Sequence, residues 1–297
     1  MGGRSKIGII GVGLMGQGIA ANIQKNGWEI GFLDHPGNQP TEMLLEKGAK
    51  AYSSAAALAE MSDVIILCVT GTPQVEDVLY REDGVLKGLM PGALVIDCST
   101  AIPSSTLKAA EAVAAAGGRF LDAPMTRTPK EAAEGRLNLI IGGDRTLFEE
   151  QLPLFQAYAE NIAYAGPVGS GHKMKLLHNF VSLGFSAIVA EAAACAERGG
   201  IEPEVLVDVL AKGGGAGVIL DRLTPYLLSK DSSSFRFSLS NANKDMGYYI
   251  RMAEDLGASR EAAGGIHTLF AAAVDEGNGE RPVPELVTLM GASPEVP

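Results

Sequence analysis

The fold of this 297-residue chain is indicated most clearly by one segment, Ile7-Gly8-Ile9-Ile10-Gly11-Val12-Gly13-Leu14-Met15-Gly16. A short apolar run, typical of a buried strand, passes directly into Gly-x-Gly-x-x-Gly, and a helical pattern follows. In this order Gly11 permits a tight turn, Gly13 lets the backbone approach a pyrophosphate, and Gly16 lets the helix pack closely on the strand. The free N–H groups at the start of the helix favour phosphates. The stretch therefore predicts a dinucleotide-binding loop.

The part of the chain up to residue 166 alternates short apolar runs with helical patterns. The runs are continuous rather than alternating, which is typical of parallel strands covered on both faces, and the alternation predicts a doubly wound, Rossmann-type parallel sheet. The expected strands are 6–10, 29–33, 64–69, 94–97, 119–123 and 138–141. The expected helices between them are 16–25, 55–60, 73–79 and 104–116.

The pattern changes after Gly166. Residues 170–198 contain no proline and predict one long helix, which would join the sheet to an all-α domain. Shorter helices are expected at 203–211, 221–228, 240–255, 260–276 and 285–290. We therefore expect a dinucleotide-binding domain over 1–166 and an all-helical substrate and dimerisation domain over 167–297. The long apolar helix suggests a homodimer or homotetramer.

Composition narrows the class of protein. With 24 Lys and Arg against 35 Asp and Glu, the net charge is −11, which disfavours nucleic acid as a partner. No uninterrupted apolar run reaches about 18 residues, so no membrane span is expected. The chain start lacks the layout of a signal peptide, and Cys68, Cys98 and Cys195 lie among apolar or small residues, so we expect reduced, buried thiols and a cytoplasmic protein. No cluster has metal-ligand spacing, and no metal is expected.

An acidic residue follows the second expected strand. The carboxylate of Asp34 would accept hydrogen bonds from the adenosine ribose hydroxyls and would repel a 2′-phosphate. No arginine or lysine stands beside it to hold that phosphate, because the next residues are His35 and Pro36. We expect NAD in preference to NADP, although His35 could carry partial charge and keeps NADP open.

Four further motifs follow the glycine loop in order. They are Asp97-Cys98-Ser99-Thr100-Ala101-Ile102-Pro103, then 122–128 with Gly135, then Gly169 to Asn179, and finally Lys244-Asp245. Over residues 6–290 the chain resembles the β-hydroxyacid dehydrogenase family, which includes 3-hydroxyisobutyrate dehydrogenases and tartronate semialdehyde reductases. The resemblance implies an NAD(P)-dependent oxidoreductase that interconverts a short anionic β-hydroxy acid, or a hydroxyalkyl sulfonate, and its semialdehyde. The alternatives are an imine reductase-like enzyme and a non-catalytic NAD-binding regulator.

The chain departs from the family pattern at two places. The usual Ser-Gly-Gly is Thr126-Arg127-Thr128, and the first Asn of an Asn-Asn pair is His178. The Arg-Thr form is similar to the loop of sulfolactaldehyde reductases, in which an arginine meets the sulfonate. A guanidinium can hold a carboxylate or sulfonate through two parallel hydrogen bonds. The alternative is a surface arginine paired with Glu131 or Glu134.

Lys175 is expected to relay the proton, as a base for the alcohol and as an acid for the aldehyde. On the long helix Asn179, Ser182 and Ser186 share its face, and such a polar stripe would be costly if it were buried without partners. We interpret the stripe as the wall of a cleft. A lysine with a pKa of about 10.4 is a poor base at neutral pH, so partial burial and nearby cations would have to lower its pKa.

The family resemblance completes the expected site. It gives Asn179 the role of orienting Lys175 or the substrate, and it places Lys244 beside the cofactor rather than in a surface ion pair with Asp245. No role is expected for His172. The residues expected to contact the cofactor are Gly11, Gly13, Leu14, Met15, Gly16, Asp34, Val69, Thr100 and Lys244. Those expected to contact the substrate are Ser99, Thr126, Arg127, Thr128, His178, Asn179 and Ser182.

Overall fold

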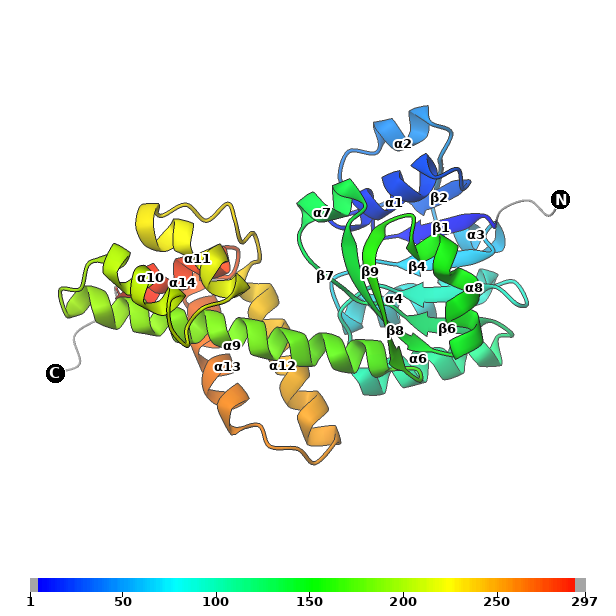
Figure 1. The fold of residues 1–297 in the computed structure, drawn as a ribbon. Coiled ribbons are helices and arrows are strands. Elements are labelled where there is room, and N and C mark those ends of the chain that lie inside the picture. Colours follow the sequence, from blue (N-terminus) through cyan, green and yellow to red (C-terminus); the bar gives the residue numbers. More distant parts are fainter. Residues whose placement is uncertain (1–4, 292–297) are drawn as a thin grey trace. The chain divides into compact units, whose positions relative to one another are not determined.

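The computed structural model describes residues 5–291 of the chain (Figure 1). Two compact units divide between Lys175 and Leu176, inside helix α9 (Ser170–Arg198). This division falls later in the chain than the end of β9 (Ala159–Gly166), where the sequence pattern changes. The domain boundary at residue 166 stays a prediction.

The described part of the first unit is built on one nine-stranded sheet of order β3-β2-β1-β4-β5-β6-β8-β7, with β9 paired to β8. The strands from β3 to β6 pair in parallel, whereas β8 is antiparallel to both β6 and β7. The Rossmann-type prediction is confirmed, with antiparallel pairs added at one side. The strands are β1 (Ile7–Ile10), β2 (Ile30–Leu33), β3 (Lys50–Tyr52), β4 (Val64–Leu67), β5 (Leu94–Asp97), β6 (Arg119–Asp122), β7 (Met125–Thr126), β8 (Leu137–Gly143) and β9.

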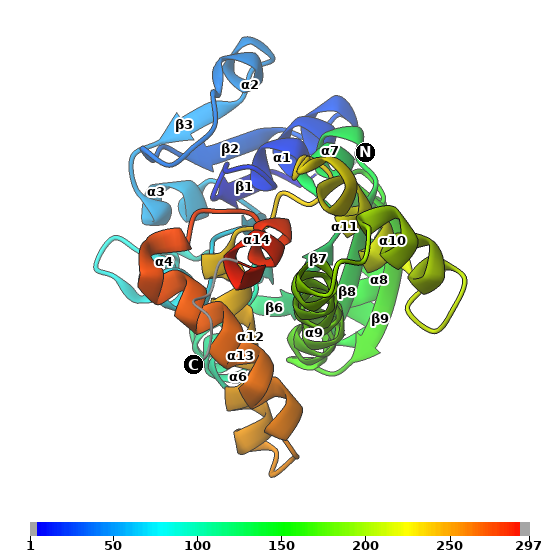
Figure 2. The same cartoon turned by 90° about the vertical axis from the view of Figure 1, so that its left-hand side faces the viewer.

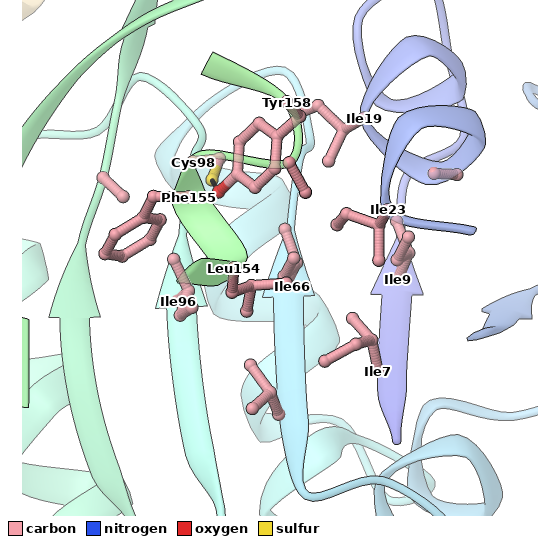
Figure 3. Packing of buried hydrophobic residues seen from close by; sticks show 14 of the residues in the cluster. Ile7, Ile9, Ile19, Ile23, Ile66, Ile96, Cys98, Leu154, Phe155 and Tyr158 are labelled. Atoms are coloured by element: carbon pink, nitrogen blue, oxygen red, sulfur yellow. Dashed lines mark hydrogen bonds between the residues drawn. The ribbon is translucent and has the colours of Figure 1, made fainter. Parts of the chain in front are cut away.

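Helices cover both faces of the central strands, because successive side chains of a strand point to opposite faces. Ile7 and Ile9 of β1 belong to one buried cluster, and Ile10 belongs to another. Figure 3 shows the first cluster, in which Ile19 and Ile23 pack over the sheet together with Leu154, Phe155 and Tyr158. The helices of this unit are α1 (Gly16–Lys25), α2 (Glu42–Glu46), α3 (Ala55–Glu60), α4 (Thr72–Tyr80), α5 (Val85–Gly88), α6 (Pro103–Ala115), α7 (Pro129–Glu134) and α8 (Arg145–Phe155).

The regular elements of the second unit are helices over its described residues, as expected, and the unit has its own core. That core includes Leu183 and Ala187 of α9 together with Phe270 and Met246. Helices α12 and α13 lie side by side, which both views of the ribbon show (Figures 1 and 2). The elements after α9 are α10 (Pro203–Ala211), α11 (Val218–Ser229), α12 (Leu239–Asp255), α13 (Glu261–Ala273), η1 (Val274–Asn278), η2 (Val283–Glu285) and α14 (Leu286–Gly291).

Helix α9 has the bounds that the sequence predicted, and its hydropathy bears on the expectation that the chain has no membrane span. It is long and apolar enough to cross a membrane by length and composition, with a mean hydropathy of 1.5 over 18 residues. The search for an uninterrupted apolar run missed it because polar residues such as Asn179 and Ser182 break the run. The core helix of a folded domain passes the same test, and 56% of this window is buried.

The three cysteines are free thiols, but their burial differs from the expectation. Cys98 is buried and Cys68 is half-buried, whereas Cys195 is exposed. Cys195 lies on the same side of α9 as Val181 and Ile188, since these positions repeat every seven residues, and both of those side chains are exposed. The apolar context of Cys195 therefore reflects an exposed apolar face and not a core.

Candidate active site

The three glycines of the loop after β1 have different reasons to be glycine. Gly11 has a φ of +96°, and a Cβ there would overlap the carbonyl oxygen of Cys68. A Cβ on Gly16 would overlap the carbonyl oxygen of Gly11, so the fold itself requires both. A Cβ on Gly13 would meet no atom of the described chain within 4 Å. The fold leaves room at Gly13 that a side chain would fill, and this room fits a pyrophosphate that approaches the backbone.

The segment after β2 is bonded to the glycine loop. The Asn38 side chain accepts a hydrogen bond from the Val12 N–H at 3.3 Å and donates one to the Leu33 carbonyl at 2.9 Å. The carboxylate-bearing Asp34 is exposed in this segment, and its own N–H donates to the Tyr52 carbonyl at 2.8 Å. Asp34 thus stands beside the loop, as a ribose-binding acid would. Sequence reasoning missed Asn38, whose only signal was a polar residue just after Pro36-Gly37.

The residues that follow β4 and β5 come together. The Val69 N–H donates to the Ser99 hydroxyl at 3.1 Å, and the Ser99 N–H donates to Asp97 Oδ1 at 2.9 Å. Asp97 and Ser99 are buried, and Thr100 beside them is half-buried. Burial raises the pKa of Asp97, and its Oδ2 accepts no hydrogen bond within residues 5–291. Two residues expected at the cofactor and one expected at the substrate therefore lie at the carboxyl ends of adjacent parallel strands, where such sheets bind ligands.

Two thiols, of which Cys98 is buried and Cys68 is half-buried, lie just before these residues and can be excluded as nucleophiles. Burial raises the pKa of the Cys68 thiol to about 12, and it raises the pKa of Cys98 well above its usual value. The Cys98 Sγ lies 3.9 Å from the hydroxyl of Tyr158, a contact visible in Figure 3. Because only a thiolate is nucleophilic, neither group can attack a substrate at neutral pH.

The start of α9 is fixed by a carboxylate at the end of β6. Asp122 is fully buried, and it accepts the N–H of Gly169 at 2.7 Å and the N–H of His172 at 2.9 Å. Gly169 has a φ of +86°, and a Cβ on Gly171 would overlap the Ile140 carbonyl oxygen. These contacts explain the Gly-x-Gly that opens the helix. Lys175 follows one turn later and is half-buried.

The loop after β7 holds the arginine that departs from the family pattern. Arg127 has a φ of +84°, a left-handed conformation that suits the glycine of the usual pattern. Its guanidinium hydrogen-bonds to the Glu160 carboxylate of β9 and to the carbonyl of Arg136, both through Nη1. The hydrogen bond from Arg127 holds the pKa of Glu160 below its usual value. The acidic partner is thus Glu160, which sequence reasoning did not consider.

The two threonines of this loop have partners in the protein. Thr126 accepts a hydrogen bond from the Asn138 side chain at 3.0 Å. Thr128 caps α7: its N–H and its hydroxyl both donate to Glu131, which completes a capping box. The path of the loop is therefore set by local contacts, and the threonines hold it.

In the second unit a polar cluster surrounds Asn179. The Asn179 amide nitrogen donates to Asp245 Oδ2 at 2.6 Å, and its Oδ1 lies 2.9 Å from His178 Nδ1. Since that oxygen can only accept, His178 carries its proton on Nδ1 in this pair. Lys244 Nζ lies 3.3 Å from Asp245 Oδ1, so the ion pair considered from the sequence is present. The structure brings three expected site residues together here, around the buried Asp245.

The two serines of the polar stripe, Ser182 and Ser186, hydrogen-bond to backbone carbonyls of the same helix. The Ser182 hydroxyl donates to the Asn179 carbonyl at 3.4 Å, and the Ser186 hydroxyl donates to the Ser182 carbonyl at 2.9 Å. Such back-bonding is the usual way for a serine to lie inside an apolar helix. The serines therefore do not require a cleft wall to explain them, and Ser182 as a substrate contact stays a prediction.

The glycine loop yields a prediction that separates fold from ligand binding. Gly13→Ala should leave the Tm of the free protein within a few degrees of the wild type. The added methyl group should weaken NADH binding about tenfold or more, because it occupies the room for the pyrophosphate. Gly16→Ala is the matched control, which should fail to fold or lose many degrees of Tm because of its overlap with Gly11. Thermal unfolding and NADH fluorescence titration measure the two effects. Unchanged NADH affinity in Gly13→Ala would place the dinucleotide elsewhere.

Two family models together match nearly the whole chain. Residues 6–166 match the family model described as the NAD binding domain of 6-phosphogluconate dehydrogenase, and residues 169–290 match that described as NAD-binding of NADP-dependent 3-hydroxyisobutyrate dehydrogenase. An NAD-dependent L-serine dehydrogenase of Pseudomonas aeruginosa is 32% identical, over 87% of this chain and 85% of the relative. Glyoxylate/succinic semialdehyde reductase 1 of Arabidopsis thaliana is 28% identical, over 93% and 94%.

A solved structure extends the likeness to three dimensions. The crystal structure of 3-hydroxyisobutyrate dehydrogenase from Salmonella typhimurium has a TM-score of 0.84 and 27% identity, and the match covers 96% of this chain and 100% of that one. Both parts of the chain thus match the same family. The chain belongs to the β-hydroxyacid dehydrogenase family of NAD(P)-dependent oxidoreductases.

Proposed function

We propose that this enzyme interconverts a short anionic β-hydroxy acid, or a hydroxyalkyl sulfonate, and its semialdehyde, with Lys175 as the general acid and base. The observation that carries the proposal is the anchoring of α9. Its first turn is bonded to Asp122 at the end of β6, in the same unit as the glycine loop, and Lys175 follows one turn later. Ligands of such sheets bind at the carboxyl ends of the strands, so this anchoring supports a lysine close to the reacting atoms.

The proposed chemistry divides between the cofactor and the protein. The glycine loop, Asp34, Val69 and Thr100 hold the dinucleotide, whose nicotinamide supplies or takes up a hydride when bound. In reduction, the Lys175 ammonium gives a proton to the carbonyl oxygen, which becomes the hydroxyl. In oxidation, the neutral amine takes the proton from that hydroxyl. Asn179, oriented by its hydrogen bond to Asp245, positions the lysine or the substrate oxygen.

Arg127 is the proposed contact for the anionic end of the substrate. Its guanidinium contacts Glu160 and the Arg136 carbonyl through Nη1, so the edge formed by Nε and Nη2 is the edge proposed for a carboxylate or sulfonate. Glu160 then fixes the plane of the guanidinium without occupying that edge. The left-handed backbone supports a functional reason for the side chain, because a non-glycine residue costs about 1–2 kcal/mol there.

Asp34 supports NAD as the preferred cofactor. Its carboxylate is exposed at the end of β2, and the segment that carries it is bonded to Val12 of the glycine loop. A carboxylate at this place binds two ribose hydroxyls and repels a 2′-phosphate. His35, which follows, accepts the Gly37 N–H on Nδ1 at 2.9 Å. Nδ1 of His35 therefore already has a hydrogen-bond partner within the turn.

A second copy of this chain is the proposed partner of an exposed apolar face. Helix α10 is apolar, yet none of its residues is buried, and Val209 is 63% exposed. On α9, Val181 is 68% and Ile188 is 61% exposed. Large apolar side chains exposed on two helices support an interface with another chain. We propose a cytoplasmic homodimer or homotetramer, with no nucleic-acid or membrane partner.

Lys175→Ala should reduce kcat by at least about three orders of magnitude, because proton transfer then lacks its acid and base. The NADH affinity, measured by fluorescence titration, should stay within about twofold, because a general acid–base residue acts on the substrate oxygen. Lys173→Ala is the matched control, since it removes a half-buried lysine from the same turn and should keep kcat. A normal kcat in Lys175→Ala would remove this lysine from the mechanism.

Arg127→Gly should raise KM for carboxylate or sulfonate substrates about tenfold or more and should leave KM for neutral alcohols unchanged. Glycine relieves the left-handed strain, so the Tm should not fall, and loss of stability cannot explain the change in KM. Arg127→Lys keeps the charge and should recover only part of the affinity, because it lacks the two parallel N–H groups. Equal loss for charged and neutral substrates would contradict the proposed clamp.

Titration with both reduced cofactors tests Asp34. NADH should bind at least about tenfold more tightly than NADPH, and Asp34→Ser should narrow that ratio by weakening NADH and by removing the repulsion of the 2′-phosphate. Gln39→Ala, in the same segment, serves as a control for general disturbance of the loop. Tighter binding of NADPH by the wild type would overturn the assignment.

A further inference from the structure

A buried imidazole links the two strand ends of the site to the helix that carries Lys175. His172 is fully buried, and it lies three residues before Lys175 in the first turn of α9. Its Nε2 is 3.1 Å from the Ser99 carbonyl oxygen, and its Nδ1 is 2.8 Å from the Thr106 hydroxyl of α6. The ring thus joins three elements of the first unit, and the reaction described above does not use it.

The hydrogen-bond partners show that one ring nitrogen, Nε2, carries a proton. A carbonyl oxygen can only accept, so Nε2 carries a proton and donates to Ser99. The Thr106 hydroxyl can donate to Nδ1, or it can accept from Nδ1 while it donates to the Ile102 carbonyl at 3.2 Å. Both arrangements satisfy every group, and both keep the donation to Ser99. The tether to Ser99 is therefore independent of the charge of the ring.

Two carboxylates face the imidazole from opposite sides. Asp97 Oδ2 lies 3.9 Å from Nε2, and Asp122 Oδ2 lies 3.9 Å from Nδ1, and all three side chains are fully buried. Asp122 also accepts the backbone N–H of His172. His172 is therefore bonded through its backbone to β6 and through its ring to Ser99, in the segment that follows β5. A one-residue shift of α9 would break all of these contacts together.

Ser99 is held at every polar group of the residue. Its N–H donates to Asp97, its hydroxyl accepts from the Val69 N–H, and its carbonyl accepts from His172. The first two contacts come from neighbouring strands, and only the third reaches α9. Loss of that third contact would leave a buried carbonyl unsatisfied, at a cost of about 1–3 kcal/mol, or would let the segment move.

We propose that His172 is a positioning residue, which fixes the Ser99–Thr100 segment relative to the helical turn that carries Lys175. This inference rests on the proposed roles of Lys175, Ser99 and Thr100. A displacement of about 1 Å between a catalytic group and the bound reactants can reduce a rate by about two orders of magnitude. A hydrogen bond that joins the two sides of the site thus acts on catalysis through geometry.

The test compares His172→Leu, which removes both ring nitrogens, with His172→Gln, whose side-chain amide nitrogen can still donate to the Ser99 carbonyl. Well below the Tm, the leucine variant should lose about tenfold or more in kcat and about threefold or more in NADH affinity. The glutamine variant should recover most of both quantities, although both variants should have a lower Tm. KM for the hydroxy acid should change less than kcat, because the displaced group acts on the reacting oxygen.

Two results would overturn the proposal. One is a leucine variant that loses Tm but keeps the wild-type kcat, KM and NADH affinity, since His172 would then only stabilise the fold. The other is a folded glutamine variant as impaired as the leucine variant, since the donated hydrogen bond would then not matter. If the leucine variant does not fold, a second pair of variants, Thr106→Val and Thr106→Ser, provides the test. The valine variant should lower kcat at least about threefold, and the serine variant should keep the wild-type kcat. An unchanged kcat in the valine variant would overturn the proposal.

The NADH titration also separates this inference from the proposed function. If the wild type oxidises no β-hydroxy acid and reduces no semialdehyde, the proposed reaction fails. The affinities of the wild type, His172→Leu and His172→Gln for NADH can still be measured, because they need no substrate. Weaker NADH binding in the leucine variant, with recovery in the glutamine variant, would support the tether; equal affinities would overturn it.

Discussion

The carboxylate of Asp122 is the constraint on which the rest of the site depends. It is buried at the end of β6, where an uncompensated negative charge would be strongly unfavourable. The backbone N–H groups of Gly169 and His172, at the start of α9, compensate this charge by donating hydrogen bonds to the carboxylate. The positive end of the helix dipole also stabilises it. Strand end and helix start therefore stabilise each other. Because the helix begins at a fixed point, its residues from Ser170 to Lys175, which belong to the same unit as the sheet, have a defined place relative to it.

Sequence patterns predicted the elements that carry their own signal. The central strands are continuous apolar runs, and α3, α9 and α10 have the predicted bounds because apolar periodicity and end signals agree there. The elements that were missed depend on partners far along the chain. Strands β3 and β7 have only three and two residues, and most of β9 alternates between exposed and half-buried positions beside β8. Helix α8 contains Pro153 and was not recognised as a helix. Pairing and packing, which no local pattern records, produce these elements.

In the candidate site, too, some features could be predicted from the sequence and others could not. The glycine loop could be predicted because its requirements are local: a left-handed turn at Gly11 and a close contact between Gly16 and Gly11. The contacts that hold the site join residues far apart in sequence. His172 and Ser99 are separated by 73 positions, and Asn179 and Asp245 by 66. A histidine at such a position has no sequence signal beyond its type, which is why no role was expected for His172. In the structure it is buried near the carboxylates of Asp97 and Asp122.

The loop that holds Arg127 shows how specificity can vary while the fold stays unchanged. Its path is set by contacts that do not involve the arginine side chain: β7 pairs with β8, and Thr128 and Glu131 close the capping box of α7. The backbone at residue 127 is left-handed, as the glycine of the family pattern would allow, so the substitution adds a guanidinium without changing the course of the chain. Glu160 on β9 then orients that guanidinium. We propose that two parallel hydrogen bonds from this guanidinium to an anion outweigh the strain of about 1–2 kcal/mol, so that residue 127 sets the substrate charge that the enzyme accepts.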